Sequence, residues 1–202
     1  MDRIIEAQEI AYRADFSLLC NARGYKNAVE VGTDRGIFAR EFLSRWQGDM
    51  IHLVDDYMPY GEMPNNRHGD LFTAVTGLAP YHGRFKIVMA RSLDAARDLP
   101  TWFKPDFIDI DGDHSYAAVR DDIAAWWPKL GPDGMLAGHD FDDRHPGVMR
   151  AVTEFAAKQG LVVRVTFREG SPSWYAYKTE PEKLLLHFFD RRDITNQECR
   201  SH

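Results

Sequence analysis

The chain has 202 residues, of which 44% are hydrophobic and 28% charged, and its formal net charge is −6. This composition is that of an ordinary globular protein, and an acidic chain gives no reason to expect nucleic-acid binding. No apolar run approaches the length that crosses a membrane, and the N-terminus is charged from Asp2 onward. Cys20 and Cys199 lie far apart, so we expect reduced thiols in a cytoplasmic protein.

The length predicts one domain over residues 1–202. Its expected parts are an N-terminal segment, 1–24, with a helix over residues 2 to about 20, a core, 25–178, and a C-terminal helix and tail, 179–202. No repeat or low-complexity block divides the chain.

Short β-branched segments alternate with segments of helical periodicity. Strands are predicted at 28–31, 51–54, 85–89, 107–110 and 135–137. Helices are predicted around 38–46, 70–78, 92–98, 119–127 and 148–156. Strand-like segments at 161–167 and 174–177 predict a final hairpin, and residues 182–189 a last helix. The alternation predicts an α/β protein, a Rossmann-like, doubly wound, mostly parallel sheet with a C-terminal antiparallel hairpin.

Residues 57–69 are rich in proline, glycine and asparagine and have no periodicity. A loop this long is often a lid or a binding loop, and an irregular surface excursion is an equal alternative.

The segment 107–141 contains two predicted strands joined by a helix, and a polar cluster follows each strand. In a βαβ unit the two parallel strands end on the same edge of the sheet, where open α/β sheets bind ligands. We therefore expect Asp111, His114 and Asp140 to surround one pocket facing Gly32.

The sequence VEVGTDRG, residues 29–36, reads as a strand, a glycine turn and the start of a helix. Gly32 permits a tight turn close to a ligand, and Gly36 lets a helix begin against the strand. The turn is neither G-x-G-x-x-G nor a P-loop, and it could be purely structural. Glu30 would repel a phosphate but attract a cation, whereas Asp55, after the next strand, could bind both ribose hydroxyls. These features favour a nucleoside with a positively charged amino-acid part over a dinucleotide.

With these residues, the chain resembles the class I S-adenosylmethionine-dependent methyltransferases. Within them it is similar to metal-dependent small-molecule O-methyltransferases, especially those acting on macrolide sugars. The resemblance spans roughly residues 25–178. The matching motifs are the glycine turn, Asp55, IDGDHSY at 110–116, AGHDF at 137–141 and PGVMRAVTEF at 146–155.

The resemblance implies that the methionine part of the cofactor lies at the turn and that Asp55 binds the ribose. Ser92 falls where such enzymes contact adenine, and its alternative role is a helix N-cap. The implied cofactor-binding residues are Glu30, Gly32, Thr33, Gly36, Asp55 and Ser92.

Asp111 and Asp140 suit Mg²⁺, and relatives place a third ligand beside the second of these positions. Here that neighbour is His139, a softer ligand that would admit Mn²⁺, Fe²⁺ or Zn²⁺. Asp113, Asp142 or Asp143 could supply an oxygen instead. The alternative without a metal is that Asp111 and Asp140 only cap helices.

His114 follows Asp111 in D-x-x-H spacing, the position of the general base in the similar sugar O-methyltransferases. A hydroxyl must lose its proton before it attacks a methyl group, and a histidine can accept that proton. The alternative role, a cap on the following helix, can be filled by Ser115. By alternation along its strand Asp109 is expected to point into or beside the sheet, so we interpret it as a carboxylate that is structural or that supports the site residues from behind.

The sequence thus predicts methyl transfer to an oxygen of a small-molecule acceptor, and homo-oligomerisation is open. Three alternatives stay open. These are metal-independent N- or C-methylation, a nucleotide-dependent oxidoreductase, and a non-catalytic cofactor-binding module that docks through the apolar residues 184–189.

Overall fold

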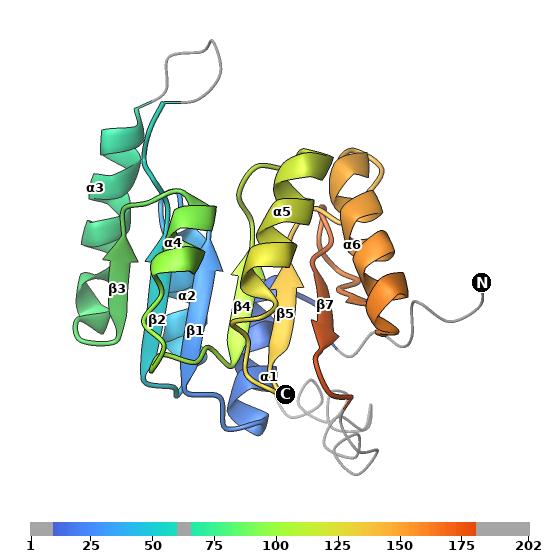
Figure 1. The fold of residues 1–202 in the computed structure, drawn as a ribbon. Helices are drawn as coiled ribbons and strands as arrows, with labels where there is room; N and C mark the ends of the chain where they lie inside the picture. The colour runs from blue at the N-terminus through green and yellow to red at the C-terminus, as the bar shows by residue number, and fades with distance from the viewer. Residues whose placement is uncertain (1–9, 60–65, 181–202) are drawn as a thin grey trace, which may run out of the picture.

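The computed structural model describes residues 10–59 and 66–180, and Figure 1 shows their arrangement. The centre is a seven-stranded sheet in the order β3-β2-β1-β4-β5-β7-β6. The first five strands are parallel, and β7 runs antiparallel to both of its neighbours, β5 and β6. The strands are β1 (Asn27–Val31), β2 (Met50–Val54), β3 (Phe85–Val88), β4 (Phe107–Ile110), β5 (Met135–Gly138), β6 (Arg164–Val165) and β7 (Trp174–Tyr177).

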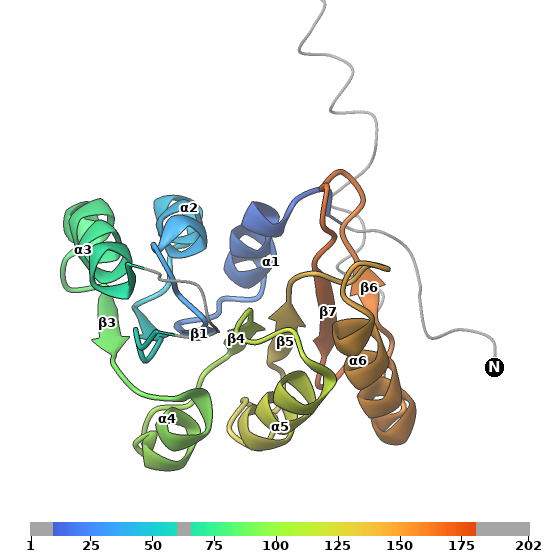
Figure 2. The same ribbon diagram turned by 90° about the horizontal axis from the view of Figure 1, so that it is seen from above.

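Helices cover both faces of the sheet, as the view from above shows (Figure 2). One face carries α1 (Phe16–Ala22), α2 (Ile37–Arg45) and α3 (Arg67–Leu78), and the other carries α4 (Ser92–Asp98), α5 (Tyr116–Trp126) and α6 (Pro146–Gln159). Two short 3-10 turns, η1 (Arg13–Asp15) and η2 (Ala79–Tyr81), precede α1 and follow α3. The predicted doubly wound, mostly parallel sheet with a C-terminal antiparallel hairpin is confirmed.

Each face of the sheet buries its own hydrophobic core. Phe42 and Phe107 stack at 5.2 Å between α2 and the sheet, and fully buried Trp126 packs α5 against the opposite face. These closely packed side chains hold the helices against the two faces of the sheet. No helix of the described residues is long and apolar enough to cross a membrane.

Local sequence signals explain where the helices next to the strand ends begin. The Ser115 side chain accepts from the backbone N–H of Ala118 at 3.3 Å, which is N-capping of α5. Pro146 occupies the first turn of α6, where its missing N–H costs nothing. Because Ser115 is the cap, His114 is free of that role.

Three sequence predictions need correction. The sequence predicts a helix from residue 2, but residues 10–12 are not helical, and the helical part begins with the η1 turn before α1. Residues 1–9 lie outside the described part. The loop predicted to reach residue 69 ends earlier, because the Asn66 side chain caps α3 by accepting from the N–H of Gly69 at 3.0 Å. The strand predicted over 161–167 is only the two-residue β6. The predicted helix at 182–189 and residues 60–65 lie outside the described residues.

Candidate active site

The strand order places the functional edge at β1, β4 and β5. Their last residues pair side by side, Val31 with Ile110 and Ile110 with Gly138, and the three strands are parallel. The residues after each strand, among them Gly32 and Asp111, therefore emerge on one edge of the sheet. The predicted meeting of these strand ends is confirmed.

Gly32 is held against the end of β4. Its φ of +88° lies in the left-handed region, and a Cβ at this position would lie 2.0 Å from the carbonyl oxygen of Asp111. Only glycine fits there without moving the backbone that carries the Asp111 side chain. Gly36 has a φ of +69°, and a Cβ at this position would lie 3.2 Å from Ala74 Cβ of α3. Gly36 lies outside both cavities described below.

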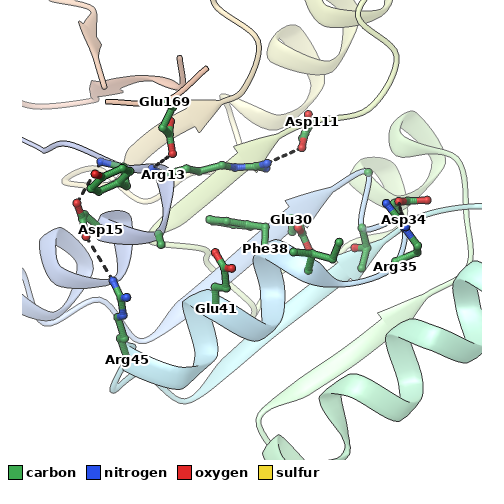
Figure 3. Close-up of a pocket in the computed structure, with 15 residues that line it drawn as sticks. Arg13, Asp15, Glu30, Asp34, Arg35, Phe38, Glu41, Arg45, Asp111 and Glu169 are labelled. Carbon is green, nitrogen blue, oxygen red and sulfur yellow. Dashed lines mark hydrogen bonds and ion pairs between the residues drawn. The ribbon is translucent and has the colours of Figure 1, made fainter. Parts of the chain in front are cut away.

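The N-terminal η1 turn contributes a guanidinium that the sequence did not reveal (Figure 3). Arg13 extends over the Phe38 ring, 4.1 Å from its centroid, and its Nη1 donates to Asp111 Oδ2 at 2.6 Å. Its Nη2 donates to Asp109, whose side chain is fully buried. The Arg13 backbone N–H donates to Glu169 of the β6–β7 loop. Arg13 thus joins two distant segments to the functional edge.

The pKa values of the two carboxyls that contact Arg13, Asp109 and Asp111, are shifted in opposite directions. Burial raises the pKa of Asp109 despite Arg13. For Asp111, burial alone would raise the pKa, but Arg13, His114 and His139 outweigh it and lower the pKa to about 2. Asp111 is therefore an anion at neutral pH, and its Oδ1 is turned away from Arg13 toward the histidines.

A cavity of about 420 Å³ opens between Arg13 and the glycine turn, and Figure 3 shows the side chains around it. Glu30 is 1% exposed, and burial raises its pKa well above the ordinary value, although Arg13 opposes this. Glu30 Oε2 and Thr33 Oγ1 are buried and have no hydrogen-bond partner among the described residues. Buried polar atoms without a hydrogen-bond partner are rare in proteins, so a bound ligand or water is expected at these two atoms.

His114 lies between two carboxylates of the functional edge. Its Nε2 is 3.4 Å from Asp111 Oδ1 and its Nδ1 is 3.2 Å from Asp140 Oδ2. The hydrogen-bonding contact with Asp111 raises the pKa of His114 against the opposing effect of burial, and the charge of Asp140 adds to it. The predicted meeting of Asp111, His114 and Asp140 around one pocket is confirmed.

Asp140 is held in a conformation unusual for aspartate. Its φ is 58°, and the other positive-φ residues besides glycine in the described part, Asp34 and Tyr57, also follow strands, β1 and β2. Such conformations cluster at functional sites, where the surroundings enforce them. The Asp140 carboxylate accepts a hydrogen bond from Ser171 and lies 3.1 Å from His139 Nδ1 through Oδ1.

Two overlapping sets of side chains have the spacing of a metal site among the described residues. Ligand atoms of Asp111, His139 and Asp140 lie within 4.8 Å of one another, and so do those of His114, Asp140 and His145. Neither set includes the aspartates 113, 142 or 143 that the sequence left open. His145, just before α6, was missed because no motif marks it. Its ring meets the His114 ring edge-on at 5.0 Å.

Asp55 contacts Arg67, a second arginine that the sequence analysis did not identify. Arg67 Nη2 donates to both carboxylate oxygens, at 2.8 and 2.9 Å, and both side chains are 7% exposed. The backbone N–H groups of Asp34 and Tyr57 also donate to Asp55. This network fixes Asp55 at the end of β2.

A second cavity, of about 1110 Å³, runs along the edge from the glycine turn to α4. Gly32 and Asp111 border both cavities, so the two spaces adjoin. His114, Asp55 and Ser92 line the second one. The N-cap residue of α4 is Arg91, and the Ser92 hydroxyl accepts from Trp126 Nε1 at 2.9 Å, so the capping alternative for Ser92 is wrong.

The fold and the edge site together define a class I methyltransferase type of protein. Residues 29–141, more than half of the chain, match the family described as methyltransferase domain. The chain belongs to this methyltransferase family. No curated protein sequence matches it.

Solved structures with the same fold have low sequence identity to the chain. A cofactor-bound protein, Rv0187 from MTB, has a TM-score of 0.66 at 17% identity, with 87% of this chain and 85% of that chain covered. A Bacillus cereus O-methyltransferase in complex with SAH has 0.64 at 16%, covering 86% and 84%. The O-methyltransferase TomG from Streptomyces achromogenes, in complex with SAM, has 0.61 at 13%, covering 83% and 79%. These similarities confirm the fold.

Proposed function

We propose that the protein transfers a methyl group from S-adenosylmethionine to an oxygen of a small molecule. We also propose that residues 1–202 form a single methyltransferase domain. The observation that carries the proposal is the charge of the cavity beside Gly32. Six carboxyl side chains line it but only three guanidinium groups do: the acids are Asp15, Glu30, Asp34, Glu41, Asp111 and Glu169, and the bases are Arg13, Arg35 and Arg45. Such a site favours a cationic ligand, and S-adenosylmethionine carries a sulfonium and an ammonium.

The adjoining cavities match an elongated cofactor in charge and position. The ammonium of the methionine part would meet Glu30, and Thr33 would offer its hydroxyl to the carboxylate. Asp55 would take the ribose hydroxyls in exchange for its hydrogen bonds with Arg67, and the adenine would extend toward Ser92. Gly32 would allow the close approach of the chain, whereas Gly36 supports the turn by starting α2 beside α3. Two structures with this fold were solved in complex with SAH or SAM, which supports the choice of cofactor.

The reaction needs a base on the acceptor side of the sulfonium. His114 borders the second cavity, where its side chain is 37% exposed, and Asp111 and Asp140 hold its ring from two sides. We assign it to remove the acceptor hydroxyl proton, while the fixed carboxylates orient the imidazole. Methyl transfer then needs mainly alignment of oxygen, methyl carbon and sulfur.

Asp111, His139 and Asp140 fit a divalent cation in donor type and mutual spacing. Asp111 Oδ1 faces His139 Nδ1 at 3.9 Å and His114 Nε2 at 3.4 Å, while Arg13 contacts only Oδ2. These three residues would hold Mg²⁺, Mn²⁺ or a related ion. When bound, the ion would lower the pKa of the acceptor hydroxyl.

Transfer of radiolabelled methyl from S-adenosylmethionine to a panel of catechols, phenols and sugars tests the proposal. We expect methyl ethers as products, loss of activity in EDTA and its return with Mg²⁺ or Mn²⁺. His114→Gln should lower the rate at least about 100-fold, because general base catalysis is typically worth this much. His68→Gln, on the exposed side of α3, is the matched control and should keep wild-type activity. Full activity of His114→Gln would exclude it as the base, and activity that survives EDTA would select the metal-independent alternative.

A further inference from the structure

Asp122 is a buried carboxyl that the proposed reaction does not use. It lies on α5, is 6% exposed and lines the second cavity together with Ser92 and Gly112. No ion pair joins it to a basic residue within 10–59 and 66–180. Burial raises the pKa of Asp122 to about 6, and the Ser92 hydroxyl lowers it in part. A carboxyl kept in this position without a cation is costly and suggests a role in binding.

The hydrogen bonds around Asp122 leave acceptor capacity at the cavity. Trp126 Nε1 donates to Ser92 Oγ at 2.9 Å, so the Ser92 hydroxyl proton is directed to the Asp122 carboxyl. A carboxylate has two oxygens and can accept about four hydrogen bonds. The Oδ2 atom lies 3.8 Å from the position of a Cβ on Gly112, which has no side chain to cover it. The carboxyl can therefore reach a ligand that lies between α4 and the end of β4.

In the proposed binding mode this position would hold the nucleobase end of the cofactor. The glycine turn and Glu30 lie at one end of the adjoining cavities, and Asp55 follows at the end of the neighbouring strand β2. Ser92 and Asp122 border the second cavity only. An elongated nucleoside with its amino-acid part at Glu30 and its ribose at Asp55 would place its base beside them. Adenine carries an exocyclic amine with two N–H donors, which could point toward these two side chains.

We propose that Asp122 accepts a hydrogen bond from the exocyclic amine of the cofactor's adenine and selects it against a 6-oxo purine. The inference rests on the proposed function. A carbonyl oxygen in place of the amine would face the carboxylate oxygen and leave both without a donor. Sites built to accept from one group reject the analogue that lacks it far more strongly than apolar pockets do.

Calorimetric affinities for S-adenosylhomocysteine and its deaminated analogue, S-inosylhomocysteine, test the assignment. The wild type should prefer the adenosyl compound by at least about 10-fold. Asp122→Asn should reduce this ratio to about 1, because an amide can donate to the carbonyl as well as accept from the amine. Asp121→Asn, which alters only an exposed ion pair with Arg120, should keep the wild-type ratio.

An unchanged ratio in Asp122→Asn, or no preference in the wild type, would overturn the inference while leaving the proposed function intact. A wild type that binds neither compound would contradict both. A crystal structure of the wild type with S-adenosylhomocysteine gives a second reading that does not depend on the variant folding. The adenine amine within hydrogen-bond distance of Asp122 supports the assignment, and a base placed elsewhere overturns it.

Discussion

Replacing Gly32 by alanine should destabilise the protein by at least about 4 kcal/mol, among the largest effects of a single substitution. The added Cβ would lie 2.0 Å from the Asp111 carbonyl oxygen and 2.8 Å from Gly112 Cα, which are backbone atoms at the end of a buried strand. The φ of +88° adds conformational strain for any residue with a side chain. Urea unfolding followed by far-UV circular dichroism measures the loss of free energy.

Gly24→Ala is the matched control for backbone strain alone. Gly24 has a φ of +67°, but nothing lies within 4 Å of its Cβ position. It should cost only about 1–2 kcal/mol, the price of a left-handed conformation. Equal losses in the two variants would show that Gly32 and the end of β4 are not in contact as described.

Replacing Arg13 by methionine should cost about 3–5 kcal/mol at neutral pH, because it leaves buried carboxylates without their counterion. Methionine can keep much of the packing on Phe38, so the loss reports the ion pairs with Asp109 and Asp111. Arg45→Gln is the control, since Arg45 pairs with Asp15 of the same turn at 3.4 Å and is 53% exposed. An exposed pair of this kind contributes at most about 1 kcal/mol.

The Arg13 effect should depend on pH in a defined direction. Asp111 has a lowered folded pKa of about 2, so its contribution to stability is present above its unfolded pKa, about 3.9, and is lost as the pH falls through about 2. The difference in the free energy of unfolding between wild type and Arg13→Met should therefore become smaller at acidic pH. If Arg13→Met loses no more stability than Arg45→Gln, or if its loss of stability does not vary with pH, the ion pairs of Arg13 with Asp109 and Asp111 are contradicted.

The sequence predicts the functional edge well because that edge follows from local signals. Asp111 and Asp140 each come directly after a strand, and parallel strands joined by one helix must end together. The motif spacing also brings His114 to the same pocket. Each of these inferences needs only a strand boundary and the topology.

The arginines could not be predicted because their contacts depend on tertiary structure. Arg13 reaches residues 96 and 98 positions away, and the apolar spacing of the N-terminal segment suggested a continuous helix. Arg67 lies within residues 57–69, which have no periodicity, and only the Asn66 cap shows where its helix begins. The β6 strand is shorter than its alternation suggests, because only Arg164 and Val165 pair with β7.

Calorimetric titration of the purified protein with S-adenosylmethionine tests most directly whether this edge is a methyl-donor site. We predict one molecule bound per chain and binding weakened at least about 10-fold in Asp55→Ala, since a hydrogen bond to a charged group is worth about 1.5–3 kcal/mol. Asp98→Ala, at an exposed carboxylate outside both cavities, should change the affinity much less. A wild type that gives no binding heat at several temperatures, or an Asp55→Ala variant that folds and binds as tightly as the wild type, would contradict the account.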